Sequence, residues 1–91
     1  MKHNKHIVVL NINSPTGDMY ASGSNDGTTG EANHPILICK DVVTDSPYYI
    51  LANRVGEKEG ESYQTVFLPH DSVVAIYQYD PESENPLGFS S

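Results

Sequence analysis

The sequence predicts an all-β protein, a five-stranded, strongly bent antiparallel small barrel with little or no helix. Three observations support this fold class. Short runs rich in β-branched and aromatic residues alternate with turns of Gly, Pro, Asp and Ser. Apolar residues nowhere recur at i, i+3, i+4 and i+7 without a Gly or Pro between them, so we expect no amphipathic helix. The last two apolar runs are separated only by residues 69–72, a connection too short for a helix.

The N-terminal half contains one strong strand and a long loop. Apolar side chains occupy both faces of residues 6–13, which we predict to be the first strand. Residues 14–18 have the proline and glycine of a turn, and residues 19–21 suggest a short strand. Residues 22–34 have no apolar period and predict a long loop, which in a small domain is either mobile or functional.

The remaining strands follow at regular spacing. We predict them at residues 35–43, 48–55, 63–68 and 73–79, with turns at 45–47 and 56–61. Residues 1–80 then form a single domain, and the acidic and proline-containing segment 81–91 is expected to be a flexible C-terminal tail.

The connection at 69–72 has two interpretations. Two strands this close usually form a hairpin. A tight step of Pro69, His70, Asp71 and Ser72 can instead be a single 3₁₀ turn that redirects the chain, so that both strands continue around a small barrel.

The charge distribution argues against non-specific nucleic-acid binding. The net charge is −7, from 12 acidic and 5 basic residues. Residues 1–40 are neutral, whereas residues 41–91 carry nine acids against Arg54 and Lys58. Phosphate binding needs clustered lysine and arginine to release counterions from the nucleic-acid backbone, and this chain has no such cluster.

Cysteine content and hydropathy indicate the compartment. Cys39 is the only cysteine, so no disulfide can form within one chain. Its apolar neighbours favour a small buried hydrophobe over a reactive thiol or an intermolecular bridge. No segment reaches the ~18 apolar residues of a membrane span, and the apolar run at 7–10 is shorter than the ~7–15 residues of a signal-peptide core. We therefore expect a cytoplasmic protein.

No enzyme, cofactor or metal site is predicted. His70, Asp71 and Ser72 are the residue types of a hydrolase triad, but triad members converge from separate parts of a fold and adjacent turn residues do not. Asp71 or Ser72 is better explained as a cap of the turn. The four histidines lack the partner spacing of a zinc site, and Asn25-Asp26-Gly27 lacks the repeated acids of a calcium loop.

Five of the six tyrosines fall in the second half of the chain, on or beside predicted strands: Tyr48, Tyr49, Tyr63, Tyr77 and Tyr79. They are suited either to stacking on bases or to a subunit interface, where an apolar ring with a polar tip is useful. The acidic surroundings favour the interface.

From Ile36 onward, the order strand, acidic turn, strand, charged turn, strand, short turn, strand resembles the Sm-like (LSm) small barrel. The first family signature runs acid, two spacers, an apolar residue, asparagine and an apolar strand. The matching stretch here is Asp45-Ser46-Pro47-Tyr48-Tyr49-Ile50-Leu51, with Tyr49 in the place of the RNA-contacting asparagine. The arginine and glycine of the second signature are replaced by Leu68 and Pro69. In these departures the chain is most similar to divergent Sm-like proteins of bacteriophages, including those attributed to cyanophage.

The resemblance implies assembly into a homo-oligomeric ring. We expect a non-enzymatic assembly or binding module whose last two strands pair between copies, because neither strand has the lysine or internal proline that protects an exposed edge. The subunit-interface candidates are Tyr63, Val66, Leu68, Val73, Ala75, Tyr77 and Tyr79. The pore-side ligand candidates are Asp45, Tyr48, Tyr49, His70 and Asp71.

Three functions remain open for such a ring. The pore carboxylates would attract a cation or a basic protein or peptide. Alternatively, the same loops bind RNA through aromatic stacking, which the acidic charge opposes. A catalytic site formed between subunits, for example from His70 and a neighbour's carboxylate, is the third and weakest alternative.

Overall fold

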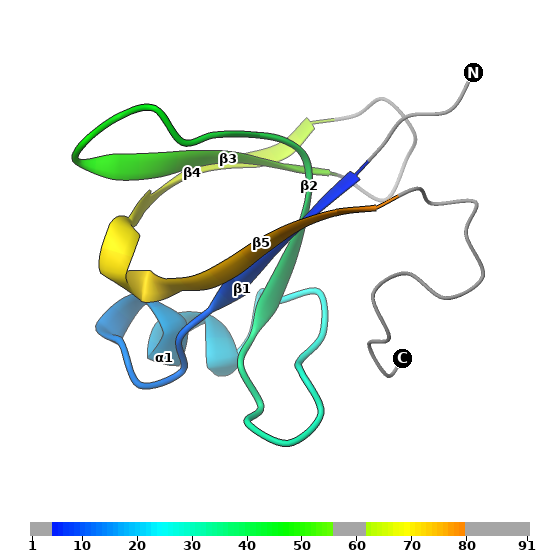
Figure 1. The fold of residues 1–91 in the computed structure, drawn as a ribbon. Helices are drawn as coiled ribbons and strands as arrows, with labels where there is room; N and C mark the ends of the chain where they lie inside the picture. Colours follow the sequence, from blue (N-terminus) through cyan, green and yellow to red (C-terminus); the bar gives the residue numbers. More distant parts are fainter. Residues whose placement is uncertain (1–4, 56–61, 80–91) are drawn as a thin grey trace.

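The computed structural model describes residues 5–55 and 62–79, which form an antiparallel five-stranded sheet with one short helix and one 3₁₀ turn (Figure 1). The prediction of an all-β fold is confirmed. In chain order the elements are β1 (Lys5–Leu10), α1 (Pro15–Ala21), β2 (Ile36–Val43), β3 (Tyr49–Val55), β4 (Ser62–Pro69), η1 (His70–Ser72) and β5 (Val73–Tyr79).

The strand order is β4-β3-β2-β1-β5, so the last two strands lie at opposite edges of the sheet. They are joined only by η1, a single 3₁₀ turn of three residues. The 3₁₀ interpretation of residues 69–72 is therefore confirmed, and the hairpin interpretation is wrong. The sheet bends around its core but does not close, because β4 and β5 do not pair with each other in the described part of the chain (Figure 1).

The predictions of a turn at 14–18 and a short strand at 19–21 are wrong, because α1 occupies this segment. The Ser14 side chain caps the helix: its Oγ accepts the Gly17 N–H at 2.9 Å and donates to the Asn11 carbonyl at 2.7 Å. Pro15 follows at the first helical position, where its missing N–H is tolerated. A seven-residue helix is too short to display an amphipathic period, so the sequence pattern could not reveal it.

The main core lies on the inner face of the bent sheet and is closed at one side by Tyr20 from α1. Its other members are Val8, Leu10, Leu37, Cys39, Ile50, Ala52, Val66 and Leu68. A second, smaller cluster of Ile7, Val9 and Ile36 lies on the opposite face of β1 and β2. Because side chains alternate between faces, two buried faces explain why β1 reads as a continuous apolar run.

The long connection at 22–34 contains no helix or strand and folds back onto β2. Ile36 N–H donates to the Gly27 carbonyl and Asp26 N–H donates to the Ile36 carbonyl, both at 2.9 Å. The Asp26 carboxylate accepts the Ile38 N–H at 2.7 Å. Pairing of β2 with β3 begins only at Cys39. The loop therefore forms hydrogen bonds with backbone groups of β2 that β3 does not reach.

Candidate functional site

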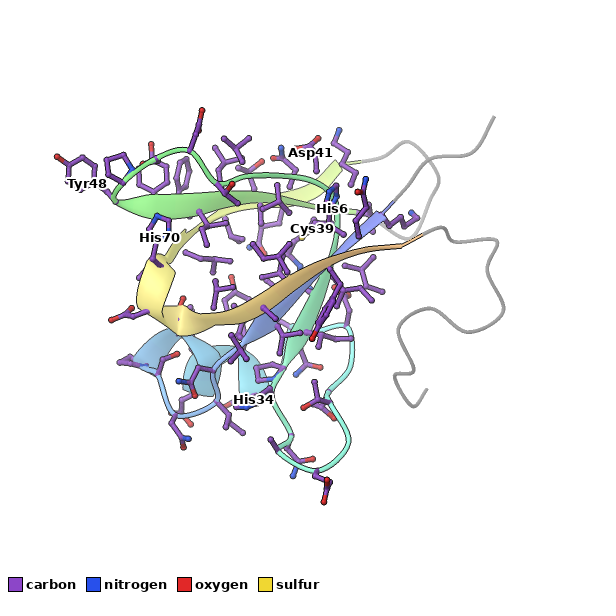
Figure 2. All side chains as sticks on the ribbon, viewed as in Figure 1. His6, His34, Cys39, Asp41, Tyr48 and His70 are labelled. Atoms are coloured by element: carbon purple, nitrogen blue, oxygen red, sulfur yellow. The ribbon has the colours of Figure 1, made fainter. Side chains whose placement is uncertain are left out.

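One end of the sheet brings together two connections that are distant in the chain. His70 Nε2 in η1 lies 2.7 Å from the Ser46 carbonyl oxygen in the β2–β3 connection. A carbonyl only accepts, so Nε2 carries the proton of this hydrogen bond. Figure 2 shows His70 and Tyr48 at this end of the molecule, away from His6 and Cys39.

Of the other four ligand candidates, three lie in the two connections that meet at this contact and one lies in a strand. Asp45 and Asp71 are exposed and adjacent in sequence to the bonded residues Ser46 and His70. Tyr48 is 82% exposed at the tip of the connection. Tyr49 instead belongs to β3, where its ring packs edge-on against Phe67 at a centroid distance of 4.9 Å.

The residues at 70–72 do not form a triad. Ser72 is buried, and its hydroxyl donates to the Pro69 carbonyl at 2.6 Å, which closes the turn. His70 is engaged with Ser46 instead. The two side chains therefore have separate partners, and the capping role expected at this turn belongs to Ser72.

The interface candidates on β4 and β5 differ in accessibility. Val66 and Leu68 are buried in the core and Val73 packs against it, whereas Tyr77 is exposed and Ala75 is half-buried. The side chains of Tyr63 and Tyr79 lie outside the described part of the structure. The side chains of β4 that face the core cannot contact another chain, so only the β4 backbone remains available at these positions.

Two exposed apolar residues on the edge strands were missed by sequence reasoning. Phe67 is 59% exposed because Val66 and Leu68 on either side face the core. Val74 is 53% exposed because a bulge inserts it between the residues of β5 that pair with β1. The alternation along β4 is visible in the sequence, but which set faces the core is fixed only by pairing with β3.

The outer edge of β5 presents backbone groups away from the sheet. The Leu10 N–H donates to the carbonyl of Pro35, directly before β2, so Leu10 directs its backbone groups toward β2. Because this direction alternates from residue to residue along an antiparallel strand, Ile7 directs its backbone groups toward β5. Ile7 pairs with Tyr77. The next residue, Gln78, therefore directs its N–H toward the outer edge.

A buried cation, Arg54, lies at the end of the inner face away from η1. Arg54 is 1% exposed, with Nη1 3.1 Å from Gln64 Oε1 and Nη2 3.4 Å from Asp26 Oδ2. Its guanidinium carbon lies 5.8 Å from the centre of the Tyr20 ring. Strand register extends this group into one row across all five strands: Gln64, Arg54, Cys39, His6 and Gln78.

The thiol in this row is not poised for reaction. Cys39 is fully buried, and burial raises the pKa of its thiol to about 12, although the Arg54 charge acts in the opposite direction. The neutral thiol is therefore retained at physiological pH. This favours the interpretation of Cys39 as a small buried hydrophobe.

The histidines are dispersed. His6, His34 and His70 lie in three separate parts of the molecule (Figure 2), and His3 is outside the described residues. His34 Nδ1 accepts the Ile12 N–H at 3.0 Å, which ties the long loop to the segment after β1. Within residues 5–55 and 62–79, no three His, Cys, Asp or Glu side chains group in a way that could hold a metal ion.

Comparison with protein-family models, curated proteins and solved structures gives no match for this chain. In the described part of the structure, no helix has the combination of length and hydropathy that crossing a membrane requires.

Proposed function

We propose that this protein is a non-enzymatic, Sm-like assembly module that forms a homo-oligomeric ring. In this arrangement the β4 edge of one copy pairs with the β5 edge of the next. The observation that carries the proposal is the strand order, which leaves β4 and β5 as the two outer strands of one antiparallel sheet. Each protomer thus offers two different, complementary edges.

The composition of both edges supports association. Neither β4 nor β5 contains a charged residue, and Pro69 lies only at the end of β4. Exposed Val74 and Tyr77 add apolar surface to the β5 strand. Proteins that remain monomeric protect such edges with lysine, internal proline or inward-pointing charges.

The connection between the edges bears on the geometry of the assembly. A β4-to-β5 contact is head-to-tail, so it gives a ring when the rotation per subunit closes and a filament when it does not. The three-residue η1 is held by the buried Ser72 and by the His70–Ser46 contact. A rigid connection fixes the angle between the two edges, which favours closure at one copy number.

RNA recognition is the competing function for such a ring. The exposed ring of Tyr48 is able to stack on a base, which is worth ~1–3 kcal/mol per base in single-strand binding proteins. The charge opposes it, because each copy contributes −7. A low-salt titration with oligo-U and oligo-A separates the two functions: binding tighter than about 10⁻⁴ M favours RNA recognition.

The assembly test uses the backbone of β5. Gln78→Pro removes an outward N–H while leaving the inward pairing intact, and proline is tolerated on such an edge. Gln78→Ala is the matched control because it keeps the N–H. By light scattering, wild type and Gln78→Ala should have a mass several times the 10.0 kDa of the chain, and Gln78→Pro should be smaller with an unchanged circular dichroism spectrum. A wild-type mass of 10 kDa at micromolar concentration contradicts the proposal.

A further inference from the structure

The outer face of β2, β3 and β4 carries an apolar strip whose residues all come from one chain. Strand register places Val43, Leu51 and Phe67 in one row across the three strands. Tyr49 lies in the next row, with its ring against Phe67. Val43, Tyr49 and Phe67 are 44%, 39% and 59% exposed, and Leu51 is half-buried. We call these four residues the outer strip.

A hydrogen-bonded polar row borders the outer strip on one side. Asn53 Nδ2 donates to Asp41 Oδ1 at 2.5 Å, and Thr65 Oγ1 donates to Asn53 Oδ1 at 2.6 Å. These residues face each other across the same three strands. The network therefore holds the Asp41 carboxylate on the outer face, beside the apolar row.

Asp45 and Asp71 belong to the two connections at the opposite end of these strands. The His70–Ser46 contact draws together the connections that carry Asp71 and Asp45, close to the start of β3 at Tyr49. From the Asn53 row to Tyr49 is four residues, about 13 Å along a strand. Asp41 therefore lies beside one end of the outer strip, and the two acidic connections lie at the other end of the same strands.

Little positive charge offsets these acids. Between Asp41 and Tyr79, the only lysine or arginine among the described residues is Arg54, which is buried on the inner face. Lys40, which precedes Asp41 in the β2 bulge, is a single exposed cation against three carboxylates. An apolar strip with acidic residues toward both ends is complementary to apolar side chains flanked by cations.

We propose that the outer strip docks a partner segment in which two to four apolar side chains are flanked on both sides by lysine or arginine. Charge favours this partner over two other occupants, a second copy of the protein and the C-terminal segment of the chain. A second copy brings the same carboxylates and a net charge of −7. The segment 80–91 carries three acids and no lysine or arginine. The proposal does not rest on ring formation, since all the contributing residues come from one protomer.

The proposal is tested by selecting peptides from a displayed random 12-residue library on the full chain. Enriched peptides should share an apolar centre with lysine or arginine on both sides. The tightest, made synthetically with a fluorescent label, should bind at least about tenfold more weakly to Phe67→Ser and Val43→Ser. The double variant Asp41→Asn/Asp45→Asn should bind more weakly and with a smaller salt dependence.

Val74→Ser is the matched control, because Val74 is an equally exposed apolar residue on β5, and its affinity should stay within about twofold of wild type. Thermal unfolding of each variant confirms that it is folded. The proposal is overturned if no peptide is enriched, if enriched peptides lack flanking cations, or if binding is insensitive to both Phe67→Ser and Val43→Ser. It is also overturned if Phe67→Ser reduces the mass of the protein in solution, since the outer strip would then be a contact between copies.

Discussion

The Asp26 carboxylate lies 3.4 Å from Nη2 of Arg54, linking a surface loop to a side chain buried in the sheet across 28 residues of sequence. The same carboxylate oxygen accepts the Ile38 N–H at 2.7 Å. One side chain of the loop therefore compensates a buried cation and completes the edge of β2. A buried charge is tolerated only when it is paired and hydrogen-bonded, so this contact fixes the loop on the sheet.

The Asp26–Arg54 contact predicts a graded loss of stability. Asp26→Ala removes both the charge and the acceptor for Ile38, and should lower the free energy of unfolding by about 2–3 kcal/mol. Asp26→Asn keeps an acceptor and should cost less. Glu31→Gln, an exposed substitution in the same loop, is the control and should stay within about 0.5 kcal/mol. Urea denaturation measures all three; equal effects of Asp26→Ala and Glu31→Gln would show that the contact is not stabilising.

Coupling between the two residues should appear in a double-mutant cycle. Arg54→Met alone removes the cation and leaves Asp26, which is partly exposed and regains water. In the Asp26→Asn background, Arg54→Met should be less destabilising than in wild type, because the arginine has already lost its countercharge. Additive effects in urea denaturation would contradict the energetic link.

Gly17 is predicted to be intolerant of any side chain. A Cβ at Gly17 would overlap the carbonyl oxygen of Asn11, which is backbone and cannot rotate away. Gly17→Ala should therefore lower the melting temperature by several degrees, even though alanine is the better helix former. Gly23→Ala is the control because a Cβ there meets nothing within 4 Å, and its melting temperature should be unchanged or higher. Equal melting temperatures for the two variants would refute the clash.

Cys39 predicts a loss of stability in alkali. Its thiol pKa is raised from 9.0 to about 12 in the folded protein, so between these values the unfolded chain loses a proton that the folded chain retains. The unfolded state is then favoured by ionisation, and the free energy of unfolding should fall from about pH 9 to pH 12, by up to about 1.4 kcal/mol per pH unit. Below pH 9 the thiol is protonated in both the folded and the unfolded state, so it does not make the free energy of unfolding depend on pH.

The control for this pH dependence is Cys39→Ala, which leaves the tyrosines in place. It should be less stable than wild type at neutral pH, because it removes buried sulfur from the core. Its stability should nevertheless fall less steeply above pH 9. Parallel curves for wild type and Cys39→Ala, measured by urea denaturation across pH 8–11, would argue against a buried thiol with a raised pKa.

Ser24 offers a stabilising substitution. Its φ of 65° lies in the left-handed region, which favours glycine. Ser24→Gly should raise the free energy of unfolding by up to about 1 kcal/mol. Ser22, with a φ of −73°, is the matched control, and Ser22→Gly should be neutral or destabilising. The reverse order of stabilities would contradict the conformation of this turn.

The sequence by itself determined the all-β class, the approximate strand positions and a short connection before β5, whereas the choice between a hairpin and a 3₁₀ turn at this connection was made only by the structure. These features depend on short-range rules: the two-residue period of a strand, the β-branched composition and the turn residues between runs. The loop at 22–34 was visible for the same reason, since it lacks an apolar period. The Sm-like relationship, the ring and the pore-side ligands remain predictions.

Other features were decided only by the tertiary structure. Helix α1 is stabilised by one cap at Ser14 and by the burial of Tyr20, neither of which produces a sequence period. The exposure of Phe67 depends on the register of β4 against β3, because shifting a strand by one residue exchanges its two faces. The pairing of Asp26 with Arg54 joins residues far apart in the chain. Such contacts are set by where the folded backbone places two side chains, and no local pattern encodes that placement.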